Sequence, residues 1–152
     1  MVKEEERIFQ GIVFCPGDPE LVALKLRTHN LNVDYNNTYE DEYEKRAAIL
    51  GEILGEMGEG TRIQGPIAFH YGTKIGRNFF GNFNLTIQDD GEVTIGDRCN
   101  FGPNVTIVTP IHPMVPEERN ALLGPDGKPK RLCYAKPVHI GSDVWLGANV
   151  VV

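Results

Sequence analysis

The segment VTIGDRCNFGPNVTIVTP, residues 93–110, contains the same pattern three times in frames of six residues: VTIGDR, CNFGPN and VTIVTP. The third position of each frame holds a large apolar residue, namely Ile95, Phe101 and Ile107. A period of six matches neither an α-helix, with about 3.6 residues per turn, nor the two-residue alternation of a half-buried strand. It is typical of a parallel β-helix, in which each frame supplies a short strand and a turn and points one side chain inward.

The same frame extends in both directions from this segment. Upstream it runs back to Thr61 with a two-residue step at Gly91 and Glu92, and downstream it resumes at Val138 after a long interruption. Three frames close one triangular coil, and coils stack through parallel backbone hydrogen bonds. Gly and Asn in the turns supply positive φ angles. Ten of the eleven third positions are large and apolar, and the exception is Gly81. The ten are Ile63, Phe69, Ile75, Ile87, Ile95, Phe101, Ile107, Ile140, Leu146 and Val152.

The chain before this repeat has a helical pattern. Asp18 is a predicted N-cap because Pro19 and Glu20 follow it, and we expect a helix that ends near Asn30. A second helix is predicted to begin at Thr38. It carries one apolar stripe, formed by Tyr43, Ala47, Leu50, Leu54 and Met57. The expected fold is therefore mainly β, with an N-terminal α-helical segment at residues 1–59 and a β-helix of hexapeptide repeats at residues 60–152.

Composition excludes several kinds of partner. The 152-residue chain has a formal net charge of −6 at pH 7 and no run of Lys and Arg that would follow a phosphate backbone, so no nucleic acid is expected. The charged N-terminus, residues 1–7, precedes no apolar stretch long enough for a signal peptide or a membrane span. We therefore expect a cytoplasmic protein with no membrane partner, which binds small molecules or protein.

The three cysteines, Cys15, Cys99 and Cys133, are an odd number at wide spacing. This pattern fits neither a disulfide framework nor a CxxC zinc site. We expect all three to be reduced, structural thiols.

The interruption of the repeat, residues 109–137, is a candidate functional loop, since a long loop leaving a regular solenoid usually has a function. His112 lies at its root between Pro110 and Pro113, whose fixed φ angles hold the backbone and direct the imidazole. Such stiffening suits a catalytic base. A lone loop histidine is more often an ordinary surface residue, so the residues alone leave both interpretations open.

Three stretches carry a resemblance to a known family: FFGNFNLTIQDD at 79–90, the T-x-x-HP motif at 109–113 with the following PEERN, and IGSDVWLGANVVV at 140–152. They resemble the galactoside and maltose O-acetyltransferases of the hexapeptide acyltransferase superfamily. The segment GDPELVALKLR…EYEKRAAILGEILG resembles the helical region that these enzymes place beside the β-helix. The motifs are specific as a set and cover nearly the whole chain.

The resemblance implies a left-handed parallel β-helix and a homotrimer with active sites between subunits. It implies transfer of acetyl from acetyl-CoA, without a metal, to a sugar hydroxyl of the galactoside, maltose or glucose type. His112 matches the general base, with direct transfer and no covalent enzyme intermediate. Asn82 and Asp90 match positions that face the acceptor sugar. Trp145 matches an aromatic residue near the acyl donor, and the Ser142 backbone N–H is the expected oxyanion donor.

The chain departs from these relatives at two acceptor contacts and at its end. Relatives usually carry an acid in the N-terminal acceptor-contacting segment, where Asp18 is the expected substitute. They commonly carry Ser or Asp where this chain has His70, which leaves the acceptor open. Relatives also continue beyond Val152 through coils that hold much of the CoA, so we expect C-terminal coils, and part of the donor site, to be missing.

Two other functions of trimeric β-helices stay open. The γ-class carbonic anhydrases bind a metal between subunits through histidines, and this chain offers His70, His112 and His139. The tight histidine pair that those enzymes use is absent from the sequence, and an open zinc site needs three ligands. A truncated, non-catalytic trimeric scaffold is the other alternative. Metal analysis tests the first alternative, and a titration with acetyl-CoA tests the second.

Overall fold

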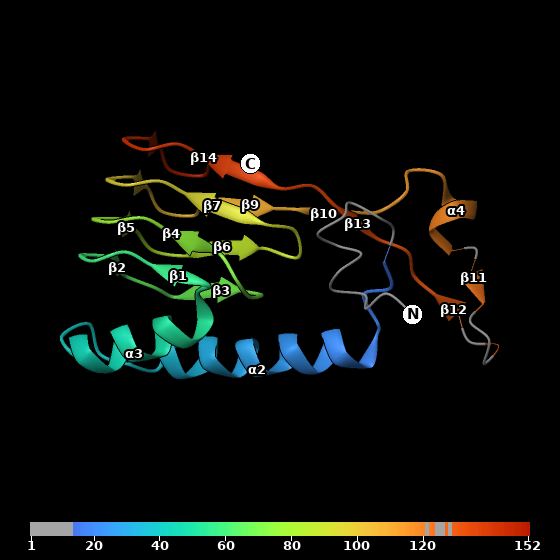
Figure 1. Cartoon of the computed structure of the whole chain (residues 1–152), viewed down its shortest axis with the longest axis horizontal. Coiled ribbons are helices and arrows are strands. Elements are labelled where there is room, and N and C mark those ends of the chain that lie inside the picture. The colour runs from blue at the N-terminus through green and yellow to red at the C-terminus, as the bar shows by residue number, and fades with distance from the viewer. Residues whose placement is uncertain (1–13, 121, 124–126, 128) are drawn as a thin grey trace.

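The computed structural model describes residues 14–120, 122–123, 127 and 129–152, so the charged N-terminus at residues 1–7 lies outside the described residues. Two helices form the base of the molecule, a stack of short strands lies on them, and a loop region extends to one side (Figure 1). Within the described residues, no helix has the length and apolar character needed to cross a membrane.

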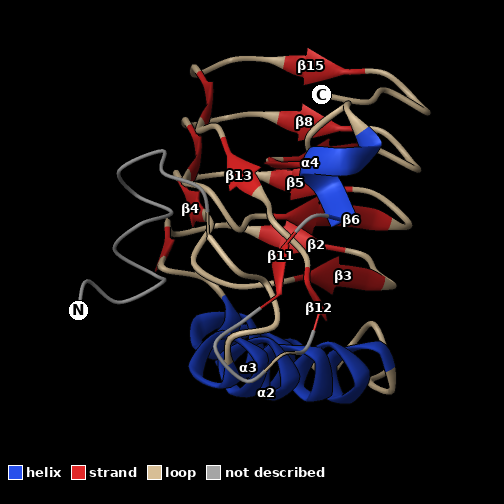
Figure 2. Cartoon of the chain, turned by 90° about the vertical axis from the view of Figure 1, so that its right-hand side faces the viewer, coloured by secondary structure: helices blue, strands red, loops and turns tan. Residues whose placement is uncertain are grey.

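The strands form three parallel sheets, which are the three faces of a β-helix (Figure 2). Arg62 pairs with Phe80, eighteen positions on, so three six-residue frames make one coil as predicted. The first sheet contains β1 (Glu56–Met57), β4 (Lys74–Ile75), β7 (Val93–Ile95) and β14 (Val138–Ile140). The second contains β2 (Arg62–Ile63), β5 (Phe80–Gly81), β8 (Asn100–Phe101) and β15 (Trp145–Leu146). The third contains β3 (Ile67–Phe69), β6 (Leu85–Gln88) and β9 (Thr106–Val108).

The interior of the coil is filled by third-position side chains, as the repeat predicts, and also by first-position side chains such as Leu85, Val93 and Val105, so these frames point two side chains inward instead of the predicted one. Ile87 and Ile107 are fully buried, and Phe101 is 1% exposed. Gly81 is the one small residue at a third position, and packing explains it. A Cβ there would lie 2.9 Å from Leu85 Cδ2 and 3.1 Å from the Phe79 ring, so the neighbouring side chains already occupy this space.

The turns adopt the positive φ angles that the sequence predicts for several asparagines. Asn78, Asn84, Asn104 and Asn149 have φ angles of 55–61°. Three of them stack in successive coils: Asn84 Nδ2 donates to Asn104 Oδ1 at 2.9 Å, and Asn104 Nδ2 donates to Asn149 Oδ1 at 3.1 Å. One corner of the coil is therefore held by a ladder of side-chain amides.

The two N-terminal helices begin and end differently from the predictions. Helix α2 (Pro19–Asn36) begins at the predicted N-cap, Asp18, but continues past Asn30. Helix α3 (Tyr43–Ile53) begins five residues after Thr38, whose hydroxyl instead donates to Tyr35 O at the end of α2. In the predicted stripe Leu50 and Leu54 are buried, whereas Tyr43 is 70% exposed. Strand β1 lies ahead of residue 60, so the first sheet starts before the predicted boundary.

Helix α2 is long because its second half covers the open edge of the first coil. The Asn36 side chain donates to Ile67 O at 2.9 Å and accepts from Ile67 N at 2.7 Å. Asn32 pairs in the same way with Phe69, at 2.7 and 3.3 Å. Strand β3 is the edge of its sheet and has no neighbouring strand on this side. The two asparagine amides take the place of that neighbour and pair with backbone groups that an edge strand leaves unpaired.

The interruption at residues 109–137 leaves the β-helix through an antiparallel pair, β10 (Pro110–Ile111) with β13 (Tyr134–Ala135). It continues through the short helix α4 (Pro116–Asn120) and a second antiparallel pair, β11 (Leu122–Leu123) with β12 (Pro129–Lys130). The solenoid then resumes in register: Asn100 on β8 pairs with Trp145 on β15. The loop therefore interrupts the sequence repeat without disturbing the stacking of coils.

Candidate active site

His112 lies at the root of the loop, directly after β10, and its side chain is exposed. Its Nδ1 atom lies 2.9 Å from the backbone oxygen of Leu132, on the opposite arm of the loop. Because a carbonyl oxygen can only accept a hydrogen bond, Nδ1 carries the proton and Nε2 keeps its lone pair. This is the tautomer that a general base requires.

The loop root is anchored by the segment before α2 and by the turn between β6 and β7. Phe14 and Cys133 exchange two backbone hydrogen bonds, at 2.8 and 3.0 Å, next to the Leu132 carbonyl that holds His112. Thr109 Oγ1 donates to Gln88 O at 2.7 Å and accepts from Gly91 N at 2.8 Å. The chain before His112 and the opposite arm of the loop are therefore both held in place, in addition to the two flanking prolines on which the sequence prediction rests. A small apolar cluster completes the anchor: Phe14, Leu21, Cys133 and Ala135.

Asp90 is buried at the same corner of the β-helix, and its two oxygens already have partners. His70 Nδ1 lies 2.8 Å from Asp90 Oδ2, and Lys25 of α2 forms an ion pair with Oδ1. Burial alone would raise the pKa of Asp90, but the hydrogen bonds and charges of His70 and Lys25 outweigh it and lower that pKa. The sequence did not reveal Lys25, because no local pattern links a helix residue to a turn so far along the chain.

Asp89, beside it, holds the turn that presents His70. Its Oδ1 accepts from the backbone N–H groups of His70 and Tyr71, at 3.0 and 2.9 Å. Its Oδ2 accepts from the N–H and the hydroxyl of Thr73, both at 2.7 Å. Burial raises the pKa of Asp89, and the hydrogen bonds from Thr73 and from the Tyr71 backbone oppose that rise. The only sequence signal for this residue was the paired aspartates after β6.

Asp18 is engaged as the N-cap of α2. Its Oδ1 accepts from the backbone N–H groups of Glu20 at 3.0 Å and Leu21 at 3.4 Å. The N-cap prediction is therefore confirmed. A contact between Asp18 and an acceptor stays a prediction.

Asn82 lies at a different corner of the coil from His70 and Asp90. It follows β5, and strand β6 separates it from Asp90. A four-residue strand spans about 13 Å. The Asn82 side chain accepts a hydrogen bond from Phe83 N at 2.8 Å, which fixes its oxygen. One chain alone therefore does not bring Asn82 and Asp90 together.

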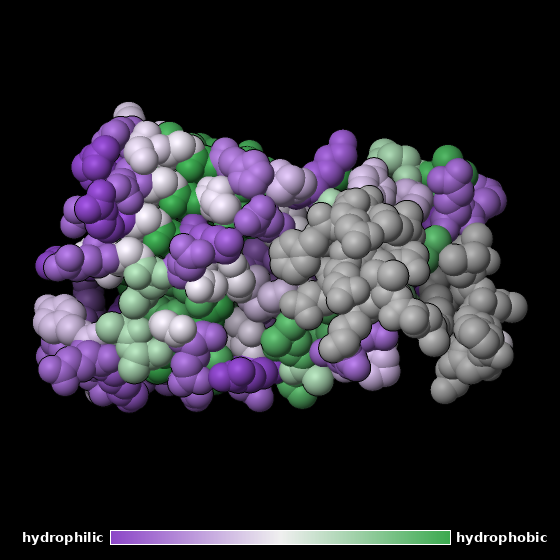
Figure 3. All heavy atoms as spheres, in the orientation of Figure 1, coloured by the Kyte–Doolittle hydropathy of each residue, from purple (hydrophilic) through white to green (hydrophobic). Residues whose placement is uncertain are grey.

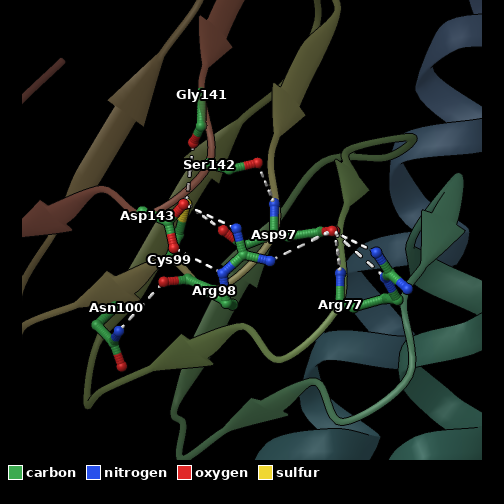
Figure 4. A network of polar contacts seen from close by, with 8 residues as sticks. All are labelled: Arg77, Asp97, Arg98, Cys99, Asn100, Gly141, Ser142 and Asp143. Carbon is green, nitrogen blue, oxygen red and sulfur yellow. Dashed lines mark hydrogen bonds and ion pairs between the residues drawn. The ribbon is translucent and has the colours of Figure 1, made fainter.

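Ser142 lies in the turn between β14 and β15, at the third corner, where hydrogen bonds join successive coils (Figure 4). Its Oγ accepts from Asp97 N at 3.0 Å. Arg98 donates to both oxygens of Asp143, at 2.6 and 2.8 Å, and this lowers the pKa of Asp143. Among the described residues, none accepts from the Ser142 N–H, so this donor is available.

The same corner contains a glycine that close packing requires, and the exposed Trp145 follows it in the chain. A Cβ on Gly96 would lie 2.6 Å from Ser142 N, so only glycine allows the turns to stack this closely. The hydrogen bonds of Arg77, first from its backbone and then from its side chain, lower the pKa of Asp97. This edge of the β-helix is strongly hydrophilic (Figure 3). Trp145 is nonetheless 79% exposed on the outside of β15.

The described structure thus brings together some of the predicted residues and separates others. His70 and Asp90 meet beside the loop root that carries His112, whereas Asn82 and Ser142 lie at the other two corners. His139 bonds Thr94 on the β7–β14 face, through Nδ1 at 2.8 Å. Within the described residues, no three His, Cys, Asp or Glu side chains gather as a metal site would require.

A β-helix of hexapeptide repeats, capped by two helices and interrupted by one histidine-bearing loop, defines the class of this protein. Residues 7–58 match the maltose acetyltransferase hexapeptide capping motif, and residues 92–112 match the hexapeptide repeat of succinyl-transferase. The chain is 40% identical to galactoside O-acetyltransferase from Escherichia coli (strain K12), over 97% of this chain and 69% of that protein.

Solved structures agree with this relationship. A maltose O-acetyltransferase from Clostridium difficile 630 superimposes with a TM-score of 0.82 at 31% identity, over 99% of this chain and 87% of the other. A galactoside acetyltransferase in complex with coenzyme A gives a TM-score of 0.77 at 35% identity, over 99% and 75%. The chain therefore belongs to the galactoside and maltose O-acetyltransferase family and is an acyltransferase.

Proposed function

We propose that this protein is an acetyl-CoA-dependent O-acetyltransferase that acetylates a hydroxyl of a sugar. The observation that carries the proposal is the His112 geometry: Nδ1 is held by the Leu132 carbonyl at 2.9 Å, and Nε2 is left on an exposed ring. The similarity to galactoside and maltose O-acetyltransferases, one of them in complex with coenzyme A, supports the substrates.

In the proposed reaction His112 Nε2 takes the proton of the acceptor hydroxyl as its oxygen attacks the thioester carbonyl. The Ser142 N–H donates to the oxygen that becomes negative. The carbon–sulfur bond then breaks, and the thiolate of CoA takes the proton from His112. No covalent bond to the enzyme forms, and no group of the enzyme changes its net protonation over the cycle.

We also propose a left-handed β-helix and a homotrimer, with each active site shared between two subunits. The placement of Asn82, Ser142 and His112 at three different corners of the β-helix, in successive coils, supports this assembly, because one chain does not bring them to a single substrate. Trp145, exposed three residues after Ser142, is proposed to line the donor side. The expected cytoplasmic location stays a prediction.

Release of free CoA from acetyl-CoA, measured with a galactoside, maltose and glucose as acceptors, tests the proposal. We expect His112→Ala to lower kcat by about 10²- to 10⁴-fold, the usual effect of losing a general base, with unchanged acetyl-CoA affinity. His139→Ala is the matched control, because His139 is also exposed but lies on the β7–β14 face.

Two results would contradict this proposal. Full activity in His112→Ala would remove this residue from the mechanism. No CoA release with any of these sugars, together with no acetyl-CoA binding by isothermal titration, would favour the non-catalytic scaffold.

A further inference from the structure

The arm of the loop that carries Leu132 lies between two other segments of backbone. On one side, β13 pairs with β10, so that Tyr134 lies opposite Ile111. On the other side, Cys133 lies opposite Phe14 and exchanges two backbone hydrogen bonds with it, at 2.8 and 3.0 Å. The segment before α2 therefore adds a third extended segment to the antiparallel pair at the loop root.

This bridge determines where the Leu132 carbonyl points. In an extended chain, the backbone groups of successive residues point to opposite sides. Both backbone groups of Cys133 are bonded to Phe14, so those of Leu132 point the other way, toward the arm that carries β10. His112 follows β10 directly, and its Nδ1 atom lies 2.9 Å from Leu132 O. The bond that sets the tautomer of His112 therefore depends on the bridge from the segment before α2.

Packing of the Phe14 side chain holds this bridge in place. Phe14 is 1% exposed, and Cys133 opposite it is 2% exposed. Both belong to an apolar cluster with Leu21, in the first turn of α2, and Ala135 of β13. The cluster is separate from the main core of the β-helix. It joins the segment before α2 to the helix and to the loop arm, so loss of the Phe14 ring would leave the backbone bridge without its anchor.

We propose that Phe14 is a positioning residue for acetyl transfer, which acts through the Leu132 carbonyl to set the tautomer and the direction of the His112 ring. In this role it needs no contact with either substrate. The inference rests on the proposed function, since it concerns the base of the proposed reaction. It gives the segment before α2 a part in proton transfer, in addition to the acceptor contact expected of Asp18.

The tautomer of His112 can be read without any activity, by ¹⁵N NMR of the imidazole rings at a pH where they are neutral. We expect the Nδ1–H form in the wild-type protein. Phe14→Ala should populate the Nε2–H form, because the ring loses its fixed acceptor. Leu50→Ala is the matched control, since Leu50 is 3% exposed but lies on α3 in the main core. It should lower Tm and leave the tautomer of His112 unchanged.

Steady-state kinetics separate positioning from a purely structural role. We expect Phe14→Ala to lower kcat about ten- to a hundredfold, because a reacting group displaced by about 1 Å can cost that much, with an unchanged KM for either substrate. Phe14→Leu keeps a large apolar side chain and should restore most of kcat and the Nδ1–H form. In the His112→Ala background, Phe14→Ala should add less than about twofold, because the base through which it acts is already gone.

Leu21→Ala loosens the same cluster from the side of α2, and it carries the test if Phe14→Ala does not fold. We expect the same changes in tautomer and kcat. Variants of the cluster that keep the wild-type tautomer and kcat, while Tm falls as in Leu50→Ala, would overturn the inference. An Nε2–H form of His112 in the wild-type protein would also overturn it.

Two further results separate this inference from the proposed function. Losses that multiply in the Phe14→Ala and His112→Ala double variant would show that Phe14 does not act through His112, and would overturn the inference while the acetyltransferase activity stands. A wild-type protein that releases no CoA would overturn the proposed function, whereas the NMR result would still decide whether Phe14 sets the tautomer of His112.

Discussion

In both His112 and His70 the Nδ1 atom faces a fixed oxygen, and the kind of oxygen differs between the two residues. His112 is held by a neutral backbone carbonyl, which places the proton on Nδ1 and leaves the Nε2 lone pair to take the proton of the acceptor. His70 is held by the Asp90 carboxylate at 2.8 Å, which fixes the orientation of its ring. The geometry therefore suits His112 for proton transfer and His70 for substrate orientation.

The cysteines are predicted to take no part in the reaction. Cys99 is fully buried with its sulfur 3.1 Å from Gly141 O, and burial raises the pKa of the Cys133 thiol. A buried, protonated thiol is a poor nucleophile. We expect Cys99→Ser and Cys133→Ser to retain a sequential rate law, measured from initial rates with both substrates varied. A ping-pong pattern that one of these changes abolishes would contradict direct transfer.

Asp90 should also give stability a specific pH dependence. Its folded-state pKa is lowered, so its stabilising contribution is present above the unfolded value of about 4 and is lost as the pH falls through the folded value. The difference in Tm between wild type and Asp90→Asn should therefore be largest near pH 7 and shrink below about pH 4. Asp34→Asn, at an exposed position on α2, should show no such convergence. A difference that stays constant across this pH range would contradict the assignment.

At the scale of elements, α2 acts as the missing strand of the first coil. Asn32 and Asn36 are one helical turn apart, so both amides face β3 and pair with alternate residues of it. Tyr35, between them, bonds Ile63 O, and the buried Arg46 of α3 donates to the same oxygen at 2.7 Å. The helices therefore close the sheets as well as burying apolar surface.

This role explains which helix boundaries sequence reasoning finds. The start of α2 is a local signal, an aspartate before Pro-Glu, and it was predicted correctly. The end of α2 depends on pairing between Asn36 and Ile67, thirty-one positions apart, which no local pattern contains. The predicted start at Thr38 failed for a related reason, since the Thr38 hydroxyl caps the end of α2.

The amide pairing predicts a selective loss of stability. Asn36→Ala removes two hydrogen bonds and leaves the backbone groups of Ile67 unpaired, so we expect a loss of about 2 kcal/mol in the free energy of unfolding. Asn32→Ala should cost at least as much, because Asn32 is buried. Asn30→Ala, at an exposed position on the same helix, should change stability by less than about 0.5 kcal/mol. Urea unfolding measures all three, and equal losses would show that helix propensity, not pairing with β3, accounts for the effect.

At the scale of the whole molecule, the six-residue period predicted that third-position side chains point inward, but it predicted neither the buried first positions nor which corner each functional residue occupies. Ile87 and Ile107 are buried at third positions as expected. Asn82 and Asp90 stand eight positions apart in the sequence, yet β6 separates them in space. Contacts such as that between Lys25 and Asp90 join the helical cap to the β-helix. Because Lys25 lies outside the repeat, the repeat pattern cannot predict such a contact.

This separation leads to a prediction about assembly. If one site uses His112 of one subunit and Asn82 of another, the protein should behave as a trimer, three times the 16.9 kDa of one chain by light scattering. His112→Ala and Asn82→Ala should each lose activity when purified separately. Unfolded together at equal amounts and refolded, they should form mixed trimers in which some sites receive both intact residues.

The recovered activity should have a definite size. With random assembly, a shared site has an intact His112 in half of the cases and an intact Asn82 in half, so about one quarter of wild-type activity should return. If both residues belonged to one chain, every site would lack one of them, and mixing would restore nothing. Refolding His112→Ala alone by the same procedure is the control, since it yields trimers without an intact His112. A mixture no more active than this control would place His112 and Asn82 in the same subunit's site, whereas an Asn82→Ala protein that is fully active by itself would remove Asn82 from the site.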